Sequence, residues 1–318
     1  MRYRNLGHSG LKVSVVSLGS WLSFEPIGQE RVNALVRMAL DGGVNLFDAA
    51  DVYARGVAEE MLAKALEGQR RDHVVLATKC YFPMSEVVTD RGLSRKHIVE
   101  SCNASLRRLR TDYLDLYQCH RYDPETPLEE TVRSMSELIA RGKILYWGTS
   151  MWSAAQLRDA CRLADQMNLP RPISEQPRYN LLHRELETEV LAACEALGIG
   201  CIVWSPLAQG MLTGKYRPGQ QPPRDSRGAD PDGIGQFLQD DLRDDALWMR
   251  LERAAHSARA AGMPLARFAL AWCLRHETVA SVIVGATRPE QLQENLKAAE
   301  VAWTSGLERL AQEVGNAV

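Results

Sequence analysis

Short apolar runs alternate with longer amphipathic stretches along almost the whole chain. Val74–Thr78 and Leu114–Cys119 are rich in apolar side chains, which is typical of strands covered on both faces. We expect eight such strands, at Val15–Leu18, Asn45–Asp48, Val74–Thr78, Leu114–Cys119, Ile144–Gly148, Ile173–Gln176, Cys201–Trp204 and Val282–Val284.

The stretches between these runs carry apolar residues at helical spacing. Ser94 and Ser153 precede two of them, where an N-cap side chain is favoured, and Gly198 follows another. Helices are therefore expected at Glu30–Leu40, Ala58–Leu66, Ser94–Leu109, Leu128–Ile139, Ser153–Met167, Glu185–Leu197 and Leu265–Leu274.

A closed (β/α)8 barrel and an open doubly wound sheet both repeat strand and helix in this way. The open sheet would carry Gly-x-Gly-x-x-Gly after its first strand, but the chain reads Leu18-Gly19-Ser20-Trp21 there. The length of 318 residues is normal for one barrel. We predict an α/β fold, a TIM barrel in a single domain over residues 1–318. A β-hairpin (Tyr3–Leu6 with Leu11–Val13) would cap it, and a C-terminal helix (Gly306–Val314) would follow it.

One segment, Tyr216–Leu238, does not fit the repeat. It is rich in Gly, Pro, Arg and Asp and too long for an ordinary barrel loop. A lid or binding loop is expected there.

The composition is 45% hydrophobic and 25% charged with a net charge of −2, as in ordinary soluble proteins. A basic stripe and an apolar run of about 20 residues are both missing, so neither nucleic-acid binding nor membrane insertion is expected. Seven scattered cysteines without a Cys-x-x-Cys pair disfavour zinc and disulfides. The N-terminus lacks the apolar core of a signal peptide, so a cytoplasmic protein without a metal is expected.

Active sites of such barrels lie at the C-terminal ends of the strands. Asp48, Tyr53, Lys79 and His120 follow or end three of the predicted strands. A phenol has a pKa near ~10, and an ammonium held by a carboxylate is expected to lower it. Such a phenol can protonate an oxygen that gains charge as hydride reaches its carbon, while a neutral imidazole orients that oxygen.

Spacing alone leaves structural alternatives for this quartet. Asp48 and Lys79 also fit a barrel-rim ion pair, His120 a hydrogen-bonded structural histidine, and Tyr53 simple packing.

At these residues the chain closely resembles the aldo-keto reductases. The matching strings, in order over nearly the whole chain, are Gly43-Val-Asn-Leu-Phe-Asp-Ala-Ala-Asp-Val-Tyr53, Thr78-Lys79, Leu109-Arg-Thr-Asp-Tyr-Leu-Asp-Leu-Tyr117 with His120, Tyr146-Trp-Gly-Thr-Ser150, Trp204-Ser-Pro-Leu-Ala208 and Gly285-Ala-Thr-Arg-Pro-Glu-Gln291. Arg91-Gly-Leu-Ser-Arg-Lys-His97 and Thr126-Pro-Leu-Glu-Glu-Thr-Val-Arg133 are most similar to the branch of voltage-gated potassium channel β subunits and their bacterial relatives.

The resemblance implies Tyr53 as general acid, tuned by Asp48 and Lys79, with His120 orienting the carbonyl. It implies NADPH as cofactor, with Ser150 and Gln176 on the nicotinamide carboxamide. The other implied cofactor-binding residues are Gly19 and Trp21; Trp204, Ser205, Pro206, Leu207, Ala208 and Gly210 along the ribose and pyrophosphate; Lys215 and Arg227 at phosphates; and Gly285, Thr287, Arg288, Gln291, Glu294 and Asn295 at the adenosine end. Thr287 and Arg288 would lie beside a 2′-phosphate, although Pro289 could equally open a helix there.

The leading hypothesis is reduction of a small-molecule aldehyde or ketone in an aromatic pocket made by Trp21, Tyr81, Phe82 and Trp152. The main alternative is a redox-sensing, NADPH-binding β-like subunit of a channel or other complex, and a homotetramer is expected by analogy. His120 favours turnover, because channel β subunits carry Asn there, whereas Met151 replaces an Arg of those subunits. A third alternative, Schiff-base chemistry on Lys79, is disfavoured by Asp48, which tends to keep the amine charged.

Overall fold

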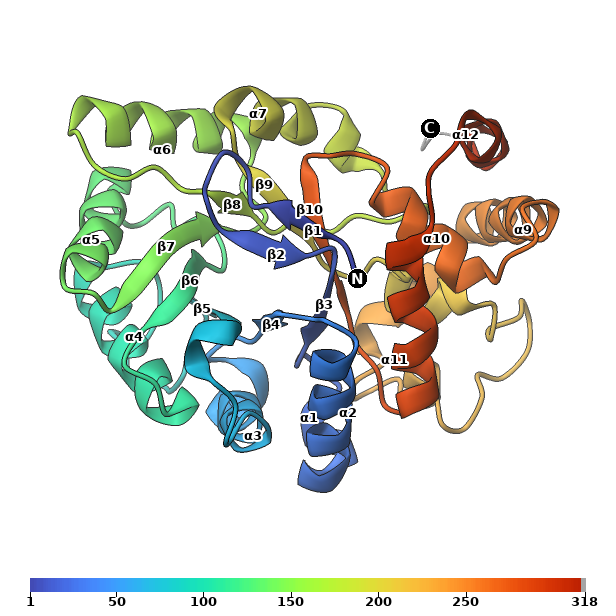
Figure 1. Ribbon diagram of the computed structural model, residues 1–318, viewed down its shortest axis with the longest axis horizontal. Coiled ribbons are helices and arrows are strands. Elements are labelled where there is room, and N and C mark those ends of the chain that lie inside the picture. Colours follow the sequence, from blue (N-terminus) through green and yellow to red (C-terminus); the bar gives the residue numbers. More distant parts are fainter. Residues whose placement is uncertain (316–318) are drawn as a thin grey trace.

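The computed structural model describes residues 1–315 and confirms the predicted barrel (Figure 1). Eight parallel strands close in the order β10-β3-β4-β5-β6-β7-β8-β9, and the last strand pairs with the first through Val282 and Val16. The strands are β3 (Val16–Gly19), β4 (Leu46–Asp48), β5 (Val75–Cys80), β6 (Leu114–Cys119), β7 (Ile144–Thr149), β8 (Ser174–Glu175), β9 (Gly200–Val203) and β10 (Val279–Val284).

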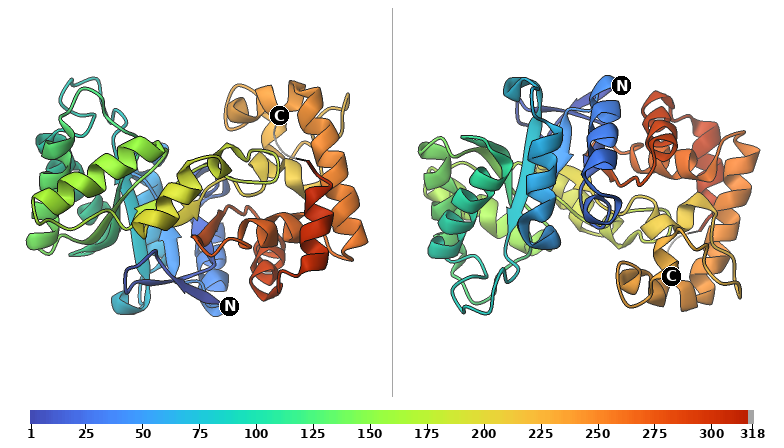
Figure 2. Two further views of the ribbon diagram at one scale, coloured as in Figure 1. Left: turned by 90° about the horizontal axis from the view of Figure 1, so that it is seen from above. Right: turned by 90° about the horizontal axis from the view of Figure 1, so that it is seen from below.

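Helices surround the barrel, and those of the C-terminal third gather on one side of it (Figure 2). The barrel helices are α2 (Gln29–Asp41), α3 (Val57–Ala65), α4 (Arg95–Leu109), α5 (Leu128–Ala140), α6 (Ala154–Gln166), α7 (Val190–Leu197), α10 (Leu265–Cys273) and α11 (Pro289–Leu296). The additional ones are α1 (Phe24–Ile27), α8 (Gln239–Arg243), α9 (Asp245–Ala260) and α12 (Ser305–Gln312). The Ser94 and Ser153 side chains accept hydrogen bonds from the backbone N–H groups of His97 and Gln156, which confirms both N-caps.

Two helical predictions need correction. The helix expected over Glu185–Leu197 is divided into a 3-10 turn at Glu185–Glu187 and α7, because Glu189 has a non-helical φ of −139°. Helix α9 was not predicted, although Asp244 caps it through the N–H groups of Ala246 and Leu247.

The hairpin of β1 (Tyr3–Asn5) and β2 (Lys12–Ser14) lies across one barrel end (Figure 1). Leu6, which follows β1, and Val13 of β2 are fully buried against side chains of the barrel interior, among them Leu46 and Leu116. Burying these chains stabilises the closed end by about 1.5–3 kcal/mol each. The opposite end, where the strands terminate, therefore remains for the site.

The predicted long loop runs over residues 216–238 and is called the strap below. It contains two short 3-10 turns, Arg227–Ala229 and Gln236–Leu238, rather than a longer element. Beyond the barrel, α12 packs on α9, and the Ser257 hydroxyl donates to the Leu310 carbonyl at 2.7 Å. Within residues 1–315, none of the helices combines the length and the apolar character needed to cross a bilayer.

Candidate active site

The structure brings the predicted quartet together at the strand ends. Lys79 on β5 donates from Nζ to both carboxylate oxygens of Asp48 on β4, at 2.9 and 2.8 Å, and to the Ala49 carbonyl at 2.7 Å. The phenolic oxygen of Tyr53 lies 3.4 Å from the same Nζ. Because the ammonium and the carboxylate are both buried, they form a neutral pair that fixes the floor of the site.

The turn that carries Tyr53 adopts an unusual backbone. Ala54 and Arg55 have φ values of 47° and 51°, and Gly56 follows at 92°. Left-handed φ values cost non-glycine residues about 1–2 kcal/mol each, so the surrounding contacts must hold this turn. A Cβ on Gly56 would lie 2.6 Å from Cδ of Arg108, whose Nε donates to buried Glu59 at 2.5 Å.

The expected lowering of the Tyr53 pKa by Lys79 is wrong. Burial, followed by the Asp48 carboxylate, holds the pKa of Tyr53 well above its ordinary value, and Arg121 only partly opposes this. The phenol is therefore fully protonated at neutral pH, which is the state a proton donor requires.

His120 follows β6 and faces Tyr53 edge-on, with ring centroids 5.7 Å apart. Burial lowers the pKa of His120 well below its ordinary value, and the charges of Lys79 and Arg121 lower it further. A neutral imidazole results. Its buried Nδ1 has no hydrogen-bond partner within residues 1–315.

Aromatic rings line the space beside Tyr53 and His120. The Trp21 ring lies 6.3 Å from that of Tyr53 and 5.9 Å from that of Trp204. On the other side, Phe82 stacks edge-on with His120 at 4.9 Å and with Tyr81 at 5.3 Å.

Two aromatic residues differ from the pattern expected for this pocket. Trp152, predicted to line the pocket, is buried with its ring against Tyr122 at 5.0 Å. Phe237 of the strap was not predicted, but it lies 5.3 Å from Trp21 and is half exposed. The strap thus adds Phe237 to the aromatic rings around Trp21.

Ser150 and Gln176, the residues expected at a nicotinamide carboxamide, end neighbouring strands. The Ser150 hydroxyl donates to the Gln176 carbonyl at 2.8 Å, and the Gln176 amide donates to Asp48 at 2.8 Å. Trp204 to Gly210 follow β9 directly, and the Ser205 hydroxyl accepts the Gln209 N–H at 3.2 Å. The predicted cofactor-binding segment therefore begins at the strand end of β9. Its residues are Trp204, Ser205, Pro206, Leu207, Ala208 and Gly210.

Three cations gather farther along, where phosphates were predicted. Arg227 of the strap donates to the Gln209 side chain, and one of its guanidinium nitrogens would lie 3.5 Å from a Cβ on Gly285. The Lys215 side chain packs against Gly210, where an added Cβ would lie 2.9 Å from Cε. Burial, and then the charge of Arg227, lower the pKa of Lys215. Neither Arg227 nor Lys215 forms an ion pair within residues 1–315.

Arg288 forms an ion pair with Asp225 of the strap at 2.7 Å. Among the described residues, this is the only ion pair that the three cations form. Such a surplus of positive charge, partly buried, fits the phosphate groups of a dinucleotide.

The remaining predicted residues lie at β10 and α11, except Gly19 on β3. Thr287 bonds to the Gln291 side chain through its N–H, at 2.9 Å, and through its hydroxyl. Glu294 is engaged by Arg267 and Lys297, and Asn295 is buried. Gly19 ends β3 where a Cβ would collide with the Ile283 side chain, so its small size is required by packing.

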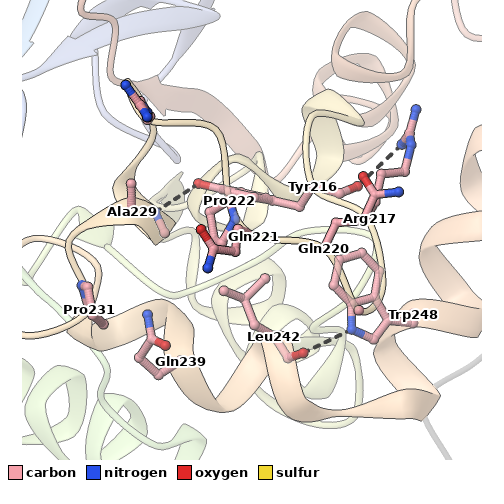
Figure 3. A pocket seen from close by; sticks show the side chains of 13 residues that line it. Tyr216, Arg217, Gln220, Gln221, Pro222, Ala229, Pro231, Gln239, Leu242 and Trp248 are labelled. Atoms are coloured by element: carbon pink, nitrogen blue, oxygen red, sulfur yellow. Dashed lines mark hydrogen bonds between the residues drawn. The ribbon is translucent and has the colours of Figure 1, made fainter.

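A cavity of about 490 Å³ is lined mostly by strap residues (Figure 3), and none of the quartet residues lines it. Its walls include Tyr216 and Pro222 of the strap, and Leu242 and Trp248 from α8 and α9. The Tyr216 hydroxyl accepts the Gly228 N–H at 3.2 Å, which ties the two limbs of the strap together. This tie keeps Arg227 next to the predicted phosphate path.

Arg121 was missed from the sequence, and Glu175, which was expected at a strand end, was given no role there. Arg121 directly follows His120, and Glu175 precedes Gln176, so both adjoin predicted residues. Glu175 is fully buried, accepts from the Thr149 hydroxyl and the Trp152 N–H, and burial raises its pKa to about 7. Within residues 1–315 no group of His, Cys, Asp or Glu side chains is arranged to hold a metal ion.

Comparison with known proteins agrees with this geometry. The model of the aldo/keto reductase family matches residues 15–306. A probable voltage-gated potassium channel subunit beta of Arabidopsis thaliana is 46% identical over 95% of this chain and 92% of its own length. A protein of the same description from Oryza sativa subsp. japonica is 45% identical over the same shares.

Proposed function

Because the chain belongs to the aldo/keto reductase family, we propose that this oxidoreductase reduces aldehydes or ketones to alcohols with NADPH. The observation that carries the proposal is the protonated Tyr53 phenol, 3.4 Å from the ammonium of a neutral Lys79–Asp48 pair and beside neutral His120. A fixed proton donor, a fixed cation and a neutral hydrogen-bond donor at one point are what carbonyl reduction requires.

The bound cofactor would supply a hydride to the carbonyl carbon. Negative charge then develops on the carbonyl oxygen, and Tyr53 donates its proton to that oxygen. The phenolate that remains is stabilised by the Lys79 ammonium 3.4 Å away, which Asp48 holds in place. His120, neutral because burial lowers its pKa, donates a hydrogen bond to the same oxygen and orients it.

The residues present fit NADPH. Ser150 and Gln176 would hold the nicotinamide end, and the partly buried Lys215 and Arg227 would meet the pyrophosphate. Arg288 with Thr287 would bind the 2′-phosphate, the group that distinguishes NADPH from NADH. We propose NADPH as the preferred cofactor on the strength of this surplus of cations.

The test is NADPH oxidation with a panel of aldehydes, ketones and quinones, comparing the wild type with Tyr53→Phe. Loss of the proton donor is expected to lower kcat by about 10²- to 10⁴-fold. The affinity for NADPH, measured by quenching of protein fluorescence, is expected to stay within about threefold, because the quartet rather than the cation cluster is changed. Undiminished turnover in Tyr53→Phe would rule out the mechanism.

A second candidate function is supported by the relatives named as channel β subunits. In that role the chain would be a cytoplasmic, redox-sensing subunit, assembled as a tetramer, and turnover would be incidental. Affinity purification of the intact chain from its own cells distinguishes the two. A stoichiometric membrane-protein partner would favour the subunit role, whereas a free protein with rapid carbonyl reduction would favour the enzyme.

A further inference from the structure

Arg121 has an incompletely satisfied guanidinium at the site. It follows His120, and its Nη1 donates to the His120 carbonyl at 2.5 Å and to the Ser150 hydroxyl at 3.5 Å. Both acceptors are uncharged oxygens. No carboxylate within residues 1–315 lies at ion-pair distance from Arg121.

The neighbouring charges compensate it only in part, and Glu175 is the carboxylate that favours its charged form. Lys79 and Asp48 neutralise each other, and Arg178 is paired with Asp241 at 2.7 Å. Glu175 uses its oxygens to accept from Thr149 and the Trp152 N–H, and burial raises its pKa to about 7. The positive charge of Arg121 therefore lacks a full counter-charge at neutral pH.

A chain of ring contacts links Arg121 to the proton donor. Its guanidinium carbon lies 5.3 Å from the Phe82 ring centroid, Phe82 stacks on His120, and His120 faces Tyr53. Burial lowers the pKa of Arg121, so keeping the charge there costs free energy that a bound anion would recover. The unused donors of the guanidinium fork match the two oxygens of a carboxylate.

We propose that Arg121 binds an anionic group on the substrate, so that the preferred carbonyl compounds are aldehydes or ketones bearing a carboxylate. This inference rests on the proposed carbonyl reduction. To that reaction the inference adds a specificity-determining residue and a substrate class.

The kinetic test compares 4-carboxybenzaldehyde with methyl 4-formylbenzoate, which has the same ring and carbonyl but no charge. The quantity measured is the ratio of their kcat/KM values at pH 8. We expect the wild type to favour the carboxylate, and Arg121→Met to lower the ratio by about 10- to 100-fold, the range of a charge-assisted hydrogen bond. Arg121→Lys, which keeps the charge but loses the fork, is expected to lie between.

Arg178→Met is the matched control, because Arg178 lies over the Trp204 ring as Arg121 lies over the Phe82 ring, but is already paired with Asp241. Its ratio is expected to equal that of the wild type. A wild type without preference for the carboxylate, or a ratio that Arg121→Met leaves unchanged, would overturn the inference.

An equilibrium measurement separates this inference from the proposed function. Calorimetric titration of the NADP⁺-saturated protein with benzoate and with neutral benzamide needs no turnover. Arg121→Met is expected to weaken benzoate at least tenfold more than benzamide. Benzoate binding that depends on Arg121 in a protein that reduces no carbonyl would refute the reductase and keep the anion site, whereas equal losses for both ligands would refute the anion site.

Discussion

Gly56→Ala probes how the fold holds the turn that presents Tyr53. The alanine Cβ would need a left-handed φ of 92° and would lie 2.6 Å from Cδ and 2.8 Å from Nε of Arg108. Arg108 is not free to move, because Nε donates to Glu59 at 2.5 Å and Nη2 to the Ser105 hydroxyl at 3.2 Å. Glu59 in turn accepts the Thr78 hydroxyl at 2.5 Å.

The expected loss of stability has two parts. A left-handed alanine costs about 1–2 kcal/mol, partly offset by about 0.4–1 kcal/mol from the less flexible unfolded chain. Displacing Arg108 leaves the Glu59 carboxylate buried without its cation, which costs about 3–5 kcal/mol in a fully buried pair. Because the Arg108 side chain is 20% exposed, we expect about 2–4 kcal/mol for this part.

Gly68→Ala is the matched control, since Gly68 has a similar φ of 81° but no atom within 4 Å of the added Cβ. Urea unfolding of both variants should show a loss at least about 2 kcal/mol larger for Gly56→Ala. Arg108→Ala removes the obstructing side chain, so adding Gly56→Ala to that variant should cost no more than Gly68→Ala does. Equal losses for the two glycine variants in the wild-type background would refute the clash.

Three further predictions concern the Lys79–Asp48 pair, the buried Glu175 carboxyl and the Phe237 ring. Lys79→Met should lower the free energy of unfolding by about 3–5 kcal/mol, because it leaves buried Asp48 unpaired. Adding Asp48→Asn should restore part of the lost stability, as a double-mutant cycle measured by urea unfolding would show. Folding raises the pKa of Glu175 from 4.5 to about 7, so the folded state binds a proton that the unfolded state has lost, and the free energy of unfolding falls by roughly 3 kcal/mol as pH rises between these values. Unfolding curves of Glu175→Gln measured over the same pH range should lack this fall. Phe237→Ala should raise KM for aromatic aldehydes about 2- to 10-fold by removing one of the aromatic rings around Trp21, with no comparable effect on acetaldehyde in the same steady-state assay.

The barrel and the proximity of the four quartet residues could be predicted because both follow from simple rules. Short apolar runs mark strands covered on both faces, and the strand ends of a closed barrel meet on one side. Asp48, Lys79 and His120 lie at or just after such ends, so their proximity follows from the order of the strands. Tyr53 needs more, because it stands five residues beyond Asp48 on a turn of unusual shape.

The shape of that turn could not be read from its residues. Ala54 and Arg55 rarely adopt positive φ, and nothing local in the sequence favours it. Their conformation depends on contacts made by residues distant in sequence, such as the Arg108–Glu59 pair. The position of Phe237 has the same origin, since a long loop takes its course from what it packs against.

The pKa of Tyr53 shows why the presence of a neighbouring charge is not enough to predict its effect. From the sequence, Lys79 was expected to favour the phenolate while Asp48 held the ammonium in place. In the structure, burial and then the Asp48 carboxylate raise the pKa of Tyr53. The tight pair does not need to make the phenol a strong acid. In the proposed reaction, burial and Asp48 keep the phenol protonated in the resting site, and the Lys79 ammonium 3.4 Å from the oxygen would stabilise the phenolate as its charge forms.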